Sequence, residues 1–249
     1  MQSADTNIRD RALAADLEAM SLGERLAFLA GGRKNAVFTT SLGLEDQVLT
    51  AALVAAAPGV RIVTLETGRL FDETIDLIEQ TEAKYGITIE RIRPDEQKLA
   101  DYVNRHGMNG FYEGIEARKA CCFVRKLEPL ARALEGADLW IAGLRRGQSA
   151  NRSDVPFAEY DADRGLLKAN PLADWDIEAV QAYVEAEGVP VNPLHARGYP
   201  SIGCEPCTRA IKPGEDERAG RWWWENDQKR ECGLHVVGAA AQTPISAQP

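Results

Sequence analysis

The chain has 249 residues, of which 45% are hydrophobic and 27% charged, as in ordinary globular proteins with one large α/β domain or two small ones. Its net charge of −9 argues against non-specific nucleic-acid binding, which depends on neutralising phosphates. No apolar run approaches the roughly 18 residues that span a membrane, and the first residues lack the apolar core of a signal peptide. We therefore expect a cytoplasmic protein with no membrane or nucleic-acid partner, whose cysteines stay reduced.

Hydrophobic periodicity predicts strands that alternate with helices over the first 188 residues. The predicted strands are 35–40, 61–66, 88–93, 138–144, 157–161 and 166–172. The predicted helices are 9–30, 47–57, 71–86, 97–107, 114–135 (kinked at Pro129) and 176–188. This alternation is typical of an α/β protein with a mostly parallel, twisted sheet flanked by helices.

The last part of the chain has a different composition. Residues 189–235 are rich in Pro, Gly, Cys and Trp and show little periodicity, so we expect an irregular functional segment packed on the sheet. The final stretch 236–249 consists of small, low-complexity sequence and is expected to be disordered. We therefore predict a single domain over 1–235, with an N-terminal helix (9–30), an α/β core (35–188) and the irregular segment.

Three predicted strands end in sequences suited to a ligand. "SLGLED" (41–46) joins a strand to a helix, where backbone N–H groups and the helix dipole favour an anion, and Ser41 adds a hydroxyl donor. The next strands end in "LETG" (65–68) and "AGLRR" (142–146). Because ligands of open α/β sheets bind at the carboxyl ends of the strands, a nucleotide pocket is expected there. Taken alone, "SLGLED" is more often an ordinary strand–helix turn than an anion site.

Four of the five cysteines form two pairs. Cys121 and Cys122 are adjacent in a predicted helix, and Cys204 and Cys207 have C-x-x-C spacing in irregular sequence. Adjacent cysteines are poorly placed to bridge each other, and a thioredoxin-like redox pair is expected after an early strand. The spacing favours a [4Fe–4S] cluster, whose ligands bind separate irons, over a zinc site; unliganded core cysteines are the third alternative.

The remaining cysteine, Cys232, lies in "RECGLH" near the carboxyl end. Nearby cations lower a thiol pKa and raise the thiolate fraction, so Cys232 is a candidate nucleophile, with an incidental surface thiol as the alternative. Arg125 and Lys126 follow the cysteine pair by one helical turn and are candidate partners of anionic sulfur, or simply solvated charges. The three tryptophans of "GRWWWEN" are expected to be packing anchors.

Seven motifs together resemble the assimilatory adenylyl-sulfate reductases, relatives of the phosphoadenylyl-sulfate reductases with the PP-loop adenine-nucleotide hydrolase-like fold. They are "SLGLED", "LETGRLF", "KACCFVRKLEPL", "GLRRGQSANRS", "GYPSIGCEPCTR", "GRWWWE" and "RECGLH". The resemblance implies a [4Fe–4S] cluster on Cys121, Cys122, Cys204 and Cys207. It also implies thioredoxin-dependent reduction of adenosine 5′-phosphosulfate to sulfite and AMP, through an S-sulfocysteine on Cys232, as part of sulfate assimilation and cysteine biosynthesis.

The resemblance also implies the substrate contacts. The nucleotide would lie against Ser41, Leu42, Gly43, Leu65, Thr67 and Gly143. The phosphosulfate would be held by Lys126, Arg152, Arg218 and Arg221, with His235 nearby. A 3′-phosphoadenylyl-sulfate or dual-specificity reductase, an ATP-using PP-loop enzyme and a non-catalytic iron–sulfur sensor stay open as alternatives. The sequence leaves monomer and homo-oligomer equally open.

Overall fold

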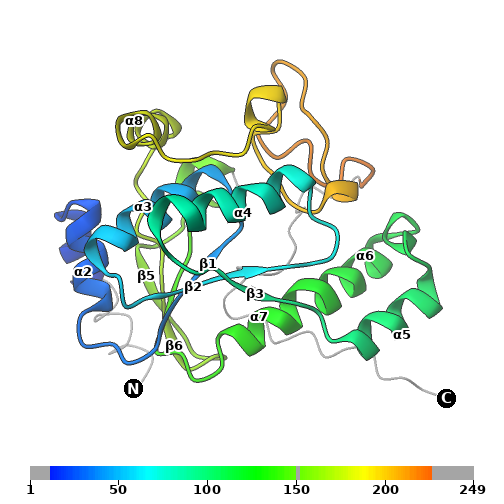
Figure 1. The fold of residues 1–249 in the computed structure, drawn as a ribbon, viewed down its shortest axis with the longest axis horizontal. Helices are drawn as coiled ribbons and strands as arrows, with labels where there is room; N and C mark the ends of the chain where they lie inside the picture. The colour runs from blue at the N-terminus through cyan, green and yellow to red at the C-terminus, as the bar shows by residue number, and fades with distance from the viewer. Residues whose placement is uncertain (1–11, 150–151, 226–249) are drawn as a thin grey trace.

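A six-stranded sheet forms the centre of the computed structural model, which describes residues 12–149 and 152–225 (Figure 1). The strand order is β3-β2-β1-β4-β6-β5, and every neighbouring pair is parallel except β5 and β6. The strands are β1 (Ala36–Thr40), β2 (Arg61–Leu65), β3 (Glu90–Ile92), β4 (Leu139–Ile141), β5 (Ala158–Asp161) and β6 (Leu166–Ala169). The predicted mostly parallel α/β sheet is confirmed.

The sheet separates two hydrophobic cores because successive side chains of a strand point to opposite faces. Phe38 of β1 is paired with Ile62 of β2 and Ile141 of β4, and all three contribute to one core. Their neighbours Val37 and Trp140 lie in the core on the other face. The central strands are therefore buried on both sides, which explains their nearly continuous apolar sequence.

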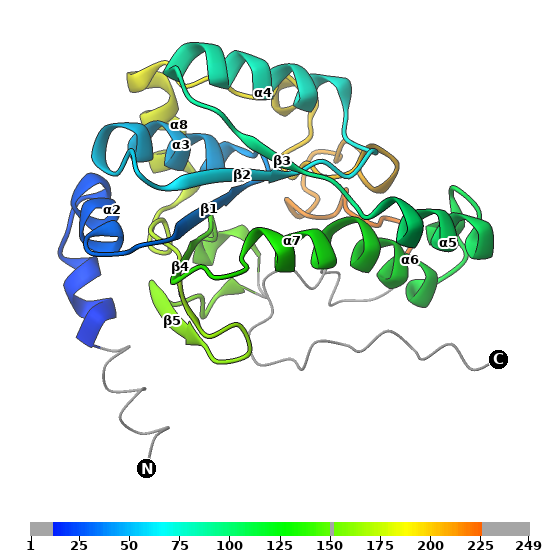
Figure 2. The same ribbon diagram turned by 60° about the horizontal axis from the view of Figure 1, so that its bottom comes forward.

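Helices cover both faces of the sheet (Figures 1 and 2). One face carries α3 (Leu44–Ala56), α4 (Asp72–Tyr85) and α8 (Ile177–Glu187), with α2 (Leu22–Ala30) packed against α3. The other face carries α5 (Glu96–His106), α6 (Ile115–Cys122) and α7 (Glu128–Ala133). No helix of the described residues is long and apolar enough to cross a bilayer.

Two predicted helices differ in detail from those observed. The helix expected over 9–30 is two helices in its described part, 12–18 and α2. Ser21 caps α2 in a reciprocal capping box with Glu24, which starts a new helix at that point. The helix expected over 114–135 contains a π-helical turn, Phe123–Leu127, just before Pro129. Proline has no N–H and its ring crowds the preceding turn, which is consistent with the wider turn there.

The segment after α8 is irregular, as predicted, up to the last described residue, 225. It passes across the carboxyl end of the sheet and lies beside α6 in both views (Figures 1 and 2). A backbone hydrogen bond links it to the loop after β2, where Glu205 N–H donates to Arg69 O at 2.8 Å. Within the segment, Trp222 N–H donates to Cys207 O at 3.2 Å. The rest of this segment and the predicted disordered tail lie outside the described residues.

Candidate active site

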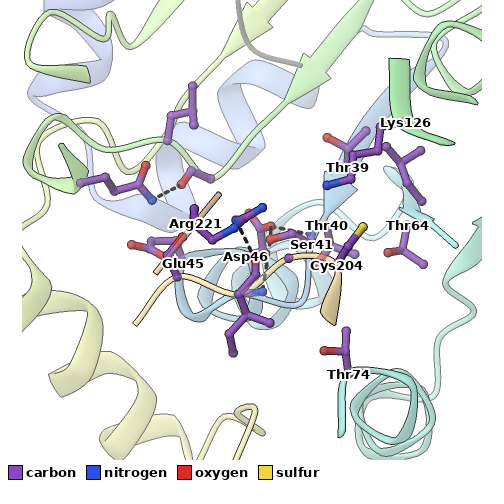
Figure 3. Close-up of a pocket in the computed structure, with 18 of the residues that line it drawn as sticks. Thr39, Thr40, Ser41, Glu45, Asp46, Thr64, Thr74, Lys126, Cys204 and Arg221 are labelled. Atoms are coloured by element: carbon purple, nitrogen blue, oxygen red, sulfur yellow. Dashed lines mark hydrogen bonds between the residues drawn. The ribbon is translucent and has the colours of Figure 1, made fainter. Parts of the chain in front are cut away.

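A cavity of about 200 Å³ opens at the carboxyl ends of β1, β2 and β4 (Figure 3). Thr39 and Thr40 of β1, Thr64 of β2 and Gly143 just after β4 line it. The structure thus brings together the three strand ends that the sequence singled out. Of the eleven predicted substrate-contact residues, nine line this cavity: Ser41, Gly43, Leu65, Thr67, Lys126, Gly143, Arg152, Arg218 and Arg221.

The loop after β1 differs from the open anion site that we expected. Ser41 donates to Asp46 Oδ2 twice, from its N–H at 2.6 Å and its hydroxyl at 2.7 Å. Leu42 N–H donates to Thr40 Oγ1 at 3.0 Å, and Gly43 N–H to Ser41 Oγ at 3.3 Å. The donors expected to bind an anion are therefore occupied by protein acceptors.

Leu42 does not line the cavity. Its backbone is left-handed (φ 59°) and its side chain is buried in the hydrophobic core below the loop. A left-handed conformation is uncommon for a leucine and persists only where the surroundings hold it. The apolar side chain therefore anchors the loop.

Asp46 connects two of the strand ends. Burial raises its pKa to about 6, although the hydrogen bonds from Ser41 act in the opposite direction. Its carboxylate lies directly against Gly143: a Cβ on that glycine would fall 2.1 Å from Asp46 Oδ1. Glycine is required at position 143 because the β1 and β4 loops approach too closely for any side chain.

Four cationic side chains line the cavity from three parts of the chain. Lys126 comes from the π-helical turn, Arg152 from the loop after β4, and Arg218 and Arg221 from the irregular segment. Arg221 is buried and lies 4.7 Å from the centre of the Trp222 ring. Its guanidinium also fills the space beside Gly203, where a Cβ would fall 2.2 Å from Nη2. The guanidinium can occupy this space only because residue 203 has no side chain.

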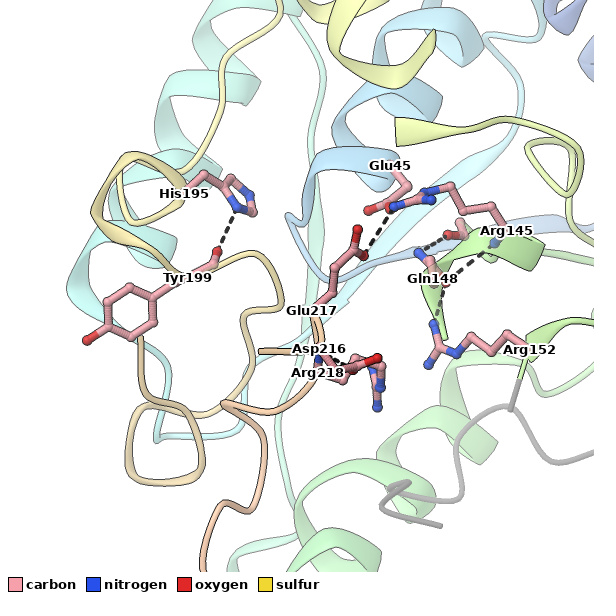
Figure 4. A network of polar contacts seen from close by, with 10 residues as sticks. Glu45, Arg145, Gln148, Arg152, His195, Tyr199, Asp216, Glu217 and Arg218 are labelled. Atoms are coloured by element: carbon pink, nitrogen blue, oxygen red, sulfur yellow. Dashed lines mark hydrogen bonds and ion pairs between the residues drawn. The ribbon is translucent and has the colours of Figure 1, made fainter. Parts of the chain in front are cut away.

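The buried Arg145 forms ion pairs with two acidic residues that line the cavity, Glu45 and Glu217 (Figure 4). Arg145 Nε donates to Glu45 at 2.6 Å, and its Nη2 lies 3.4 Å from Glu217. Gln148 accepts a hydrogen bond from Arg152 and donates to Gly143 O at 3.2 Å. This network ties α3, the β4 loop and the irregular segment together. The sequence indicated arginines at this strand end, but carried no signal for their partners.

The four paired cysteines line a second, smaller cavity of about 20 Å³. All four are buried and none is in a disulfide. The structure therefore brings the Cys121–Cys122 pair of α6 beside the C-x-x-C turn at Cys204 and Cys207. Arg118, Arg125 and Lys126 line the same cavity, so the cysteines lie in a cationic environment.

The environment affects the thiols differently. Burial acts to raise the pKa of Cys204, but Lys126, a hydrogen bond with Thr67 (Oγ1–Sγ 3.4 Å) and nearby guanidiniums hold it below the usual thiol value. Burial raises the pKa of Cys121, and that of Cys207 to about 12. These three directions apply to the thiols without a metal, which would take thiolates at all four positions.

The chemistry of the cysteine cavity is compatible with the cluster that the sequence favoured. Within residues 12–149 and 152–225, no three His, Cys, Asp or Glu side chains are placed to hold one metal ion. A four-iron cluster instead binds each thiolate to a different iron, so its ligands surround a volume. Two buried N–H donors of residues lining this cavity, Arg125 Nε and Trp222 Nε1, have no hydrogen-bond partner among the described residues. Such donors suit an anionic sulfur acceptor.

The two cavities share a wall. Lys126, Cys204 and Trp222 line both of them. Trp222 is fully buried there, as expected of a packing anchor, whereas Trp223 is exposed on the surface. His195 lines neither cavity: its Nδ1 lies 2.9 Å from Tyr199 O, and burial lowers its pKa. Two predicted site residues, Cys232 and His235, lie outside the described residues.

The family model of the phosphoadenosine phosphosulfate reductase domain matches residues 35–210, which include all three strand ends that line the cavity and both cysteine pairs. The chain belongs to this family. Adenosine 5′-phosphosulfate reductase of Agrobacterium fabrum (strain C58 / ATCC 33970) is 63% identical over 247 residues, 99% of this chain and 94% of that protein. The enzyme of the same name from Rhizobium meliloti (strain 1021) is 66% identical over 225 residues, 90% of this chain and 85% of that protein.

Solved structures agree with this assignment. The phosphoadenylyl-sulfate reductase of Candida auris, in a phosphate complex, superposes with a TM-score of 0.69 at 27% identity, covering 81% of this chain and 96% of that one. Candida glabrata FMN adenylyltransferase with FAD and pyrophosphate has a TM-score of 0.50 at 12% identity, covering 94% and 86%, which shows a likeness of fold alone. The family resemblance read from the motifs is confirmed: the chain is an enzyme of the reductase family.

Proposed function

We propose that this chain reduces adenosine 5′-phosphosulfate to sulfite and AMP, with thioredoxin as the reductant. The observation that carries the proposal is the wall shared by the cavity at the strand ends and the cysteine cavity. An anionic group beside Lys126 would lie between the two, next to the irregular segment that leads to Cys232. The names of the relatives at 63% and 66% identity support the choice of substrate.

Different kinds of residue in the cavity would contact the nucleoside and the phosphosulfate of this substrate. Loop residues and strand ends that line the cavity would contact the nucleoside: Ser41, Gly43, Leu65, Thr67 and Gly143. Lys126, Arg152, Arg218 and Arg221 would hold the phosphosulfate, joined by His235. Because the Ser41 donors are occupied by Asp46, the cationic residues and not the loop are the proposed anion site.

The proposed first step is a sulfuryl transfer. The Cys232 thiolate attacks the sulfate sulfur, a new S–S bond forms, and the S–O bond to the AMP phosphate breaks. The electron pair of that bond leaves with AMP, and Cys232 becomes S-sulfocysteine. Negative charge then gathers on the phosphate oxygen, where the arginines and Lys126 would stabilise it.

Thioredoxin completes the proposed cycle. A thiolate of the reduced partner attacks Cys232 Sγ and releases sulfite, which leaves a mixed disulfide. The second thiol of thioredoxin resolves it, so that Cys232 returns as a thiol and thioredoxin leaves as its disulfide. The two electrons needed to form sulfite thus come from the thioredoxin dithiol.

We also propose that Cys121, Cys122, Cys204 and Cys207 hold a [4Fe–4S] cluster. When bound, the cluster would supply a fixed charge and a rigid link between α6 and the C-x-x-C turn. Arg125 and Trp222 have N–H groups to offer its sulfurs, and Lys126 offsets its charge. Anaerobically purified protein should show a broad visible absorption band and contain about four irons per chain. Colourless protein that contains one zinc per chain would contradict this.

Substitution of Cys232 tests the reductase proposal. Cys232→Ser should abolish sulfite release from adenosine 5′-phosphosulfate and reduced thioredoxin, because serine is not a thiolate nucleophile. AMP affinity, measured by calorimetry, should stay within about twofold because the nucleotide contacts are unchanged. Full turnover by this variant would remove Cys232 from the mechanism. An iron–sulfur sensor would form no sulfite even as wild type, and an ATP-using enzyme would require ATP and magnesium.

A second candidate substrate is the 3′-phosphorylated nucleotide. It is favoured by the likeness to the Candida auris enzyme, which is named a phosphoadenylyl-sulfate reductase. Glu45 and Glu217 line the cavity, and their charges would oppose a further phosphate wherever it approached them. Comparison of kcat/KM for the two nucleotides separates the candidates: we expect the unphosphorylated substrate to be preferred.

A further inference from the structure

One threonine of the cavity at the strand ends differs from the others in exposure. The threonines that line this cavity are Thr39, Thr40, Thr64, Thr67 and Thr74. Four of them are at most 4% exposed, whereas Thr39, near the end of β1, is half-buried (Figure 3). Thr39 is therefore the threonine of this group that a ligand in the cavity can reach most readily.

A buried tryptophan determines the direction of the Thr39 hydroxyl. Trp140 Nε1 donates to Thr39 Oγ1 at 2.8 Å, and Trp140 is only 1% exposed. An indole N–H can donate but not accept, so Thr39 is the acceptor and its own hydroxyl hydrogen must point elsewhere. Among the described residues, no acceptor takes that hydrogen. The hydroxyl is thus held in place to donate to an acceptor inside the cavity.

The Trp140 indole is itself held by its neighbours. It lies in the core on the face of the sheet that carries α7. Lys168 Nζ lies 5.3 Å and Arg164 Cζ 5.5 Å from the centre of its ring, distances at which a cation is attracted to an aromatic face. Lys168 is fixed in turn by Glu159, at 3.3 Å. The donor that orients Thr39 therefore has little freedom to move.

The surroundings of Thr39 are apolar. Thr39 is paired with Val63 of β2, whose side chain lies in the same core as Trp140. Three leucines belong to this core or pack against it and also line the cavity: Leu65, Leu130 and Leu144. Apolar walls with a few well-placed polar groups are the usual lining for the flat ring of a ligand. This part of the cavity suits the base of a nucleotide better than its anionic groups.

We propose that Thr39 recognises the adenine base of the substrate by donating its hydroxyl hydrogen to a nitrogen of the purine ring. Adenine ring nitrogens are acceptors, so they match a hydroxyl that has only its hydrogen left to offer. Trp140 is a positioning residue that acts through Thr39. The inference rests on the proposed function and deepens it, because it names a residue that selects the nucleotide in that reaction.

Removal of the hydroxyl tests the contact. Thr39→Val keeps the shape of the side chain and should weaken AMP binding, measured by calorimetry, by about threefold to tenfold. Thr39→Ser, which keeps the hydroxyl, should retain most of the affinity. The matched control is Thr88→Val, because Thr88 is exposed and lines neither cavity, and it should bind AMP as the wild type does. Wild-type AMP affinity in Thr39→Val would overturn the proposal.

Analogues of AMP that lack one ring nitrogen test whether the base is the partner. Of 1-deaza-, 3-deaza- and 7-deaza-AMP, one should bind the wild type about as weakly as AMP binds Thr39→Val. That analogue should bind Thr39→Val and the wild type equally well, because the contact is already lost. If Thr39→Val weakens AMP and all three analogues by the same factor, the hydroxyl does not contact the base and the proposal fails.

A double variant tests the positioning role of Trp140. Trp140→Phe keeps an aromatic ring in the core but has no N–H, so AMP affinity should fall by about threefold. In the Thr39→Val background the same substitution should cause no further loss, because the hydroxyl that Trp140 orients is absent. Losses that add in the double variant would contradict the positioning role. A wild type that binds AMP but forms no sulfite would instead contradict the proposed function, so the two failures are distinguishable.

Discussion

At the scale of single residues, Asp46 determines what the strand-end loop can bind. It accepts both Ser41 donors and lies against Gly143, so it closes the loop that the sequence had presented as an anion site. Its own position depends on Leu42, whose buried side chain holds a left-handed backbone. Four cationic side chains, Lys126, Arg152, Arg218 and Arg221, line the same cavity as this carboxylate.

The pH dependence of stability tests the environment of Asp46. Its pKa is raised from 3.8 to about 6, so the folded chain binds this proton more tightly than the unfolded chain. The group therefore contributes stability below about pH 4 that is lost as pH rises through about 6. At roughly 1.4 kcal/mol per pKa unit, about 3 kcal/mol is involved.

Asp46→Asn is the matched variant, since asparagine cannot ionise. The thermal midpoint of the wild type relative to this variant should fall by several degrees between pH 4 and pH 7. Measurement of both midpoints by calorimetry at each pH checks this. A difference that does not change with pH would show that Asp46 is not buried in the way described.

At the scale of elements, the irregular segment supplies arginine and cysteine side chains that the strand ends do not provide. The strand ends provide hydroxyls, glycines and carboxylates, whereas Arg218, Arg221 and the C-x-x-C turn come from residues after α8. The π-helical turn before Pro129 contributes Lys126 to both cavities. π-Helical turns are frequent at functional sites, and this one lies where the two cavities meet.

Gly203 tests the packing of this segment. A Cβ there would fall 2.2 Å from Nη2 and 2.5 Å from Cζ of Arg221, so Gly203→Ala must displace the guanidinium from the cavity wall. We expect AMP affinity to fall about tenfold, equivalent to about 1.4 kcal/mol. Gly59→Ala, where no atom lies within 4 Å of the new Cβ, is the control and should bind AMP normally. Wild-type affinity in Gly203→Ala would mean that Arg221 does not contact the ligand.

Periodicity was sufficient to predict most elements, because buried strands and amphipathic helices have different repeats. It missed the break at Ser21, although Ser21 and Glu24 have the spacing of a capping box and could have been recognised. The motifs predicted which residues line the cavity but not their pairing. The Ser41–Asp46 contact depends on the backbone of Leu42, and Arg118–Glu225 joins distant segments, so neither is encoded in local spacing.

At the scale of the whole molecule, the fold places the four buried cysteines beside the cavity at the strand ends. Lys126, Cys204 and Trp222 form the wall that the two cavities share, and the Arg118–Glu225 ion pair links α6 to the end of the described chain. Cys232 follows seven residues later. The proposed function depends on this separation of roles, with one set of thiolates held on iron and the remaining one free to react.

The most direct test is to incubate the anaerobic wild-type protein with adenosine 5′-phosphosulfate in the absence of thioredoxin and to map sulfonation by peptide mass spectrometry. The account predicts one sulfonate per chain, on Cys232, released as sulfite when reduced thioredoxin is added. Sulfite formed without any sulfonated Cys232, or a sulfonate carried by another residue, would contradict it.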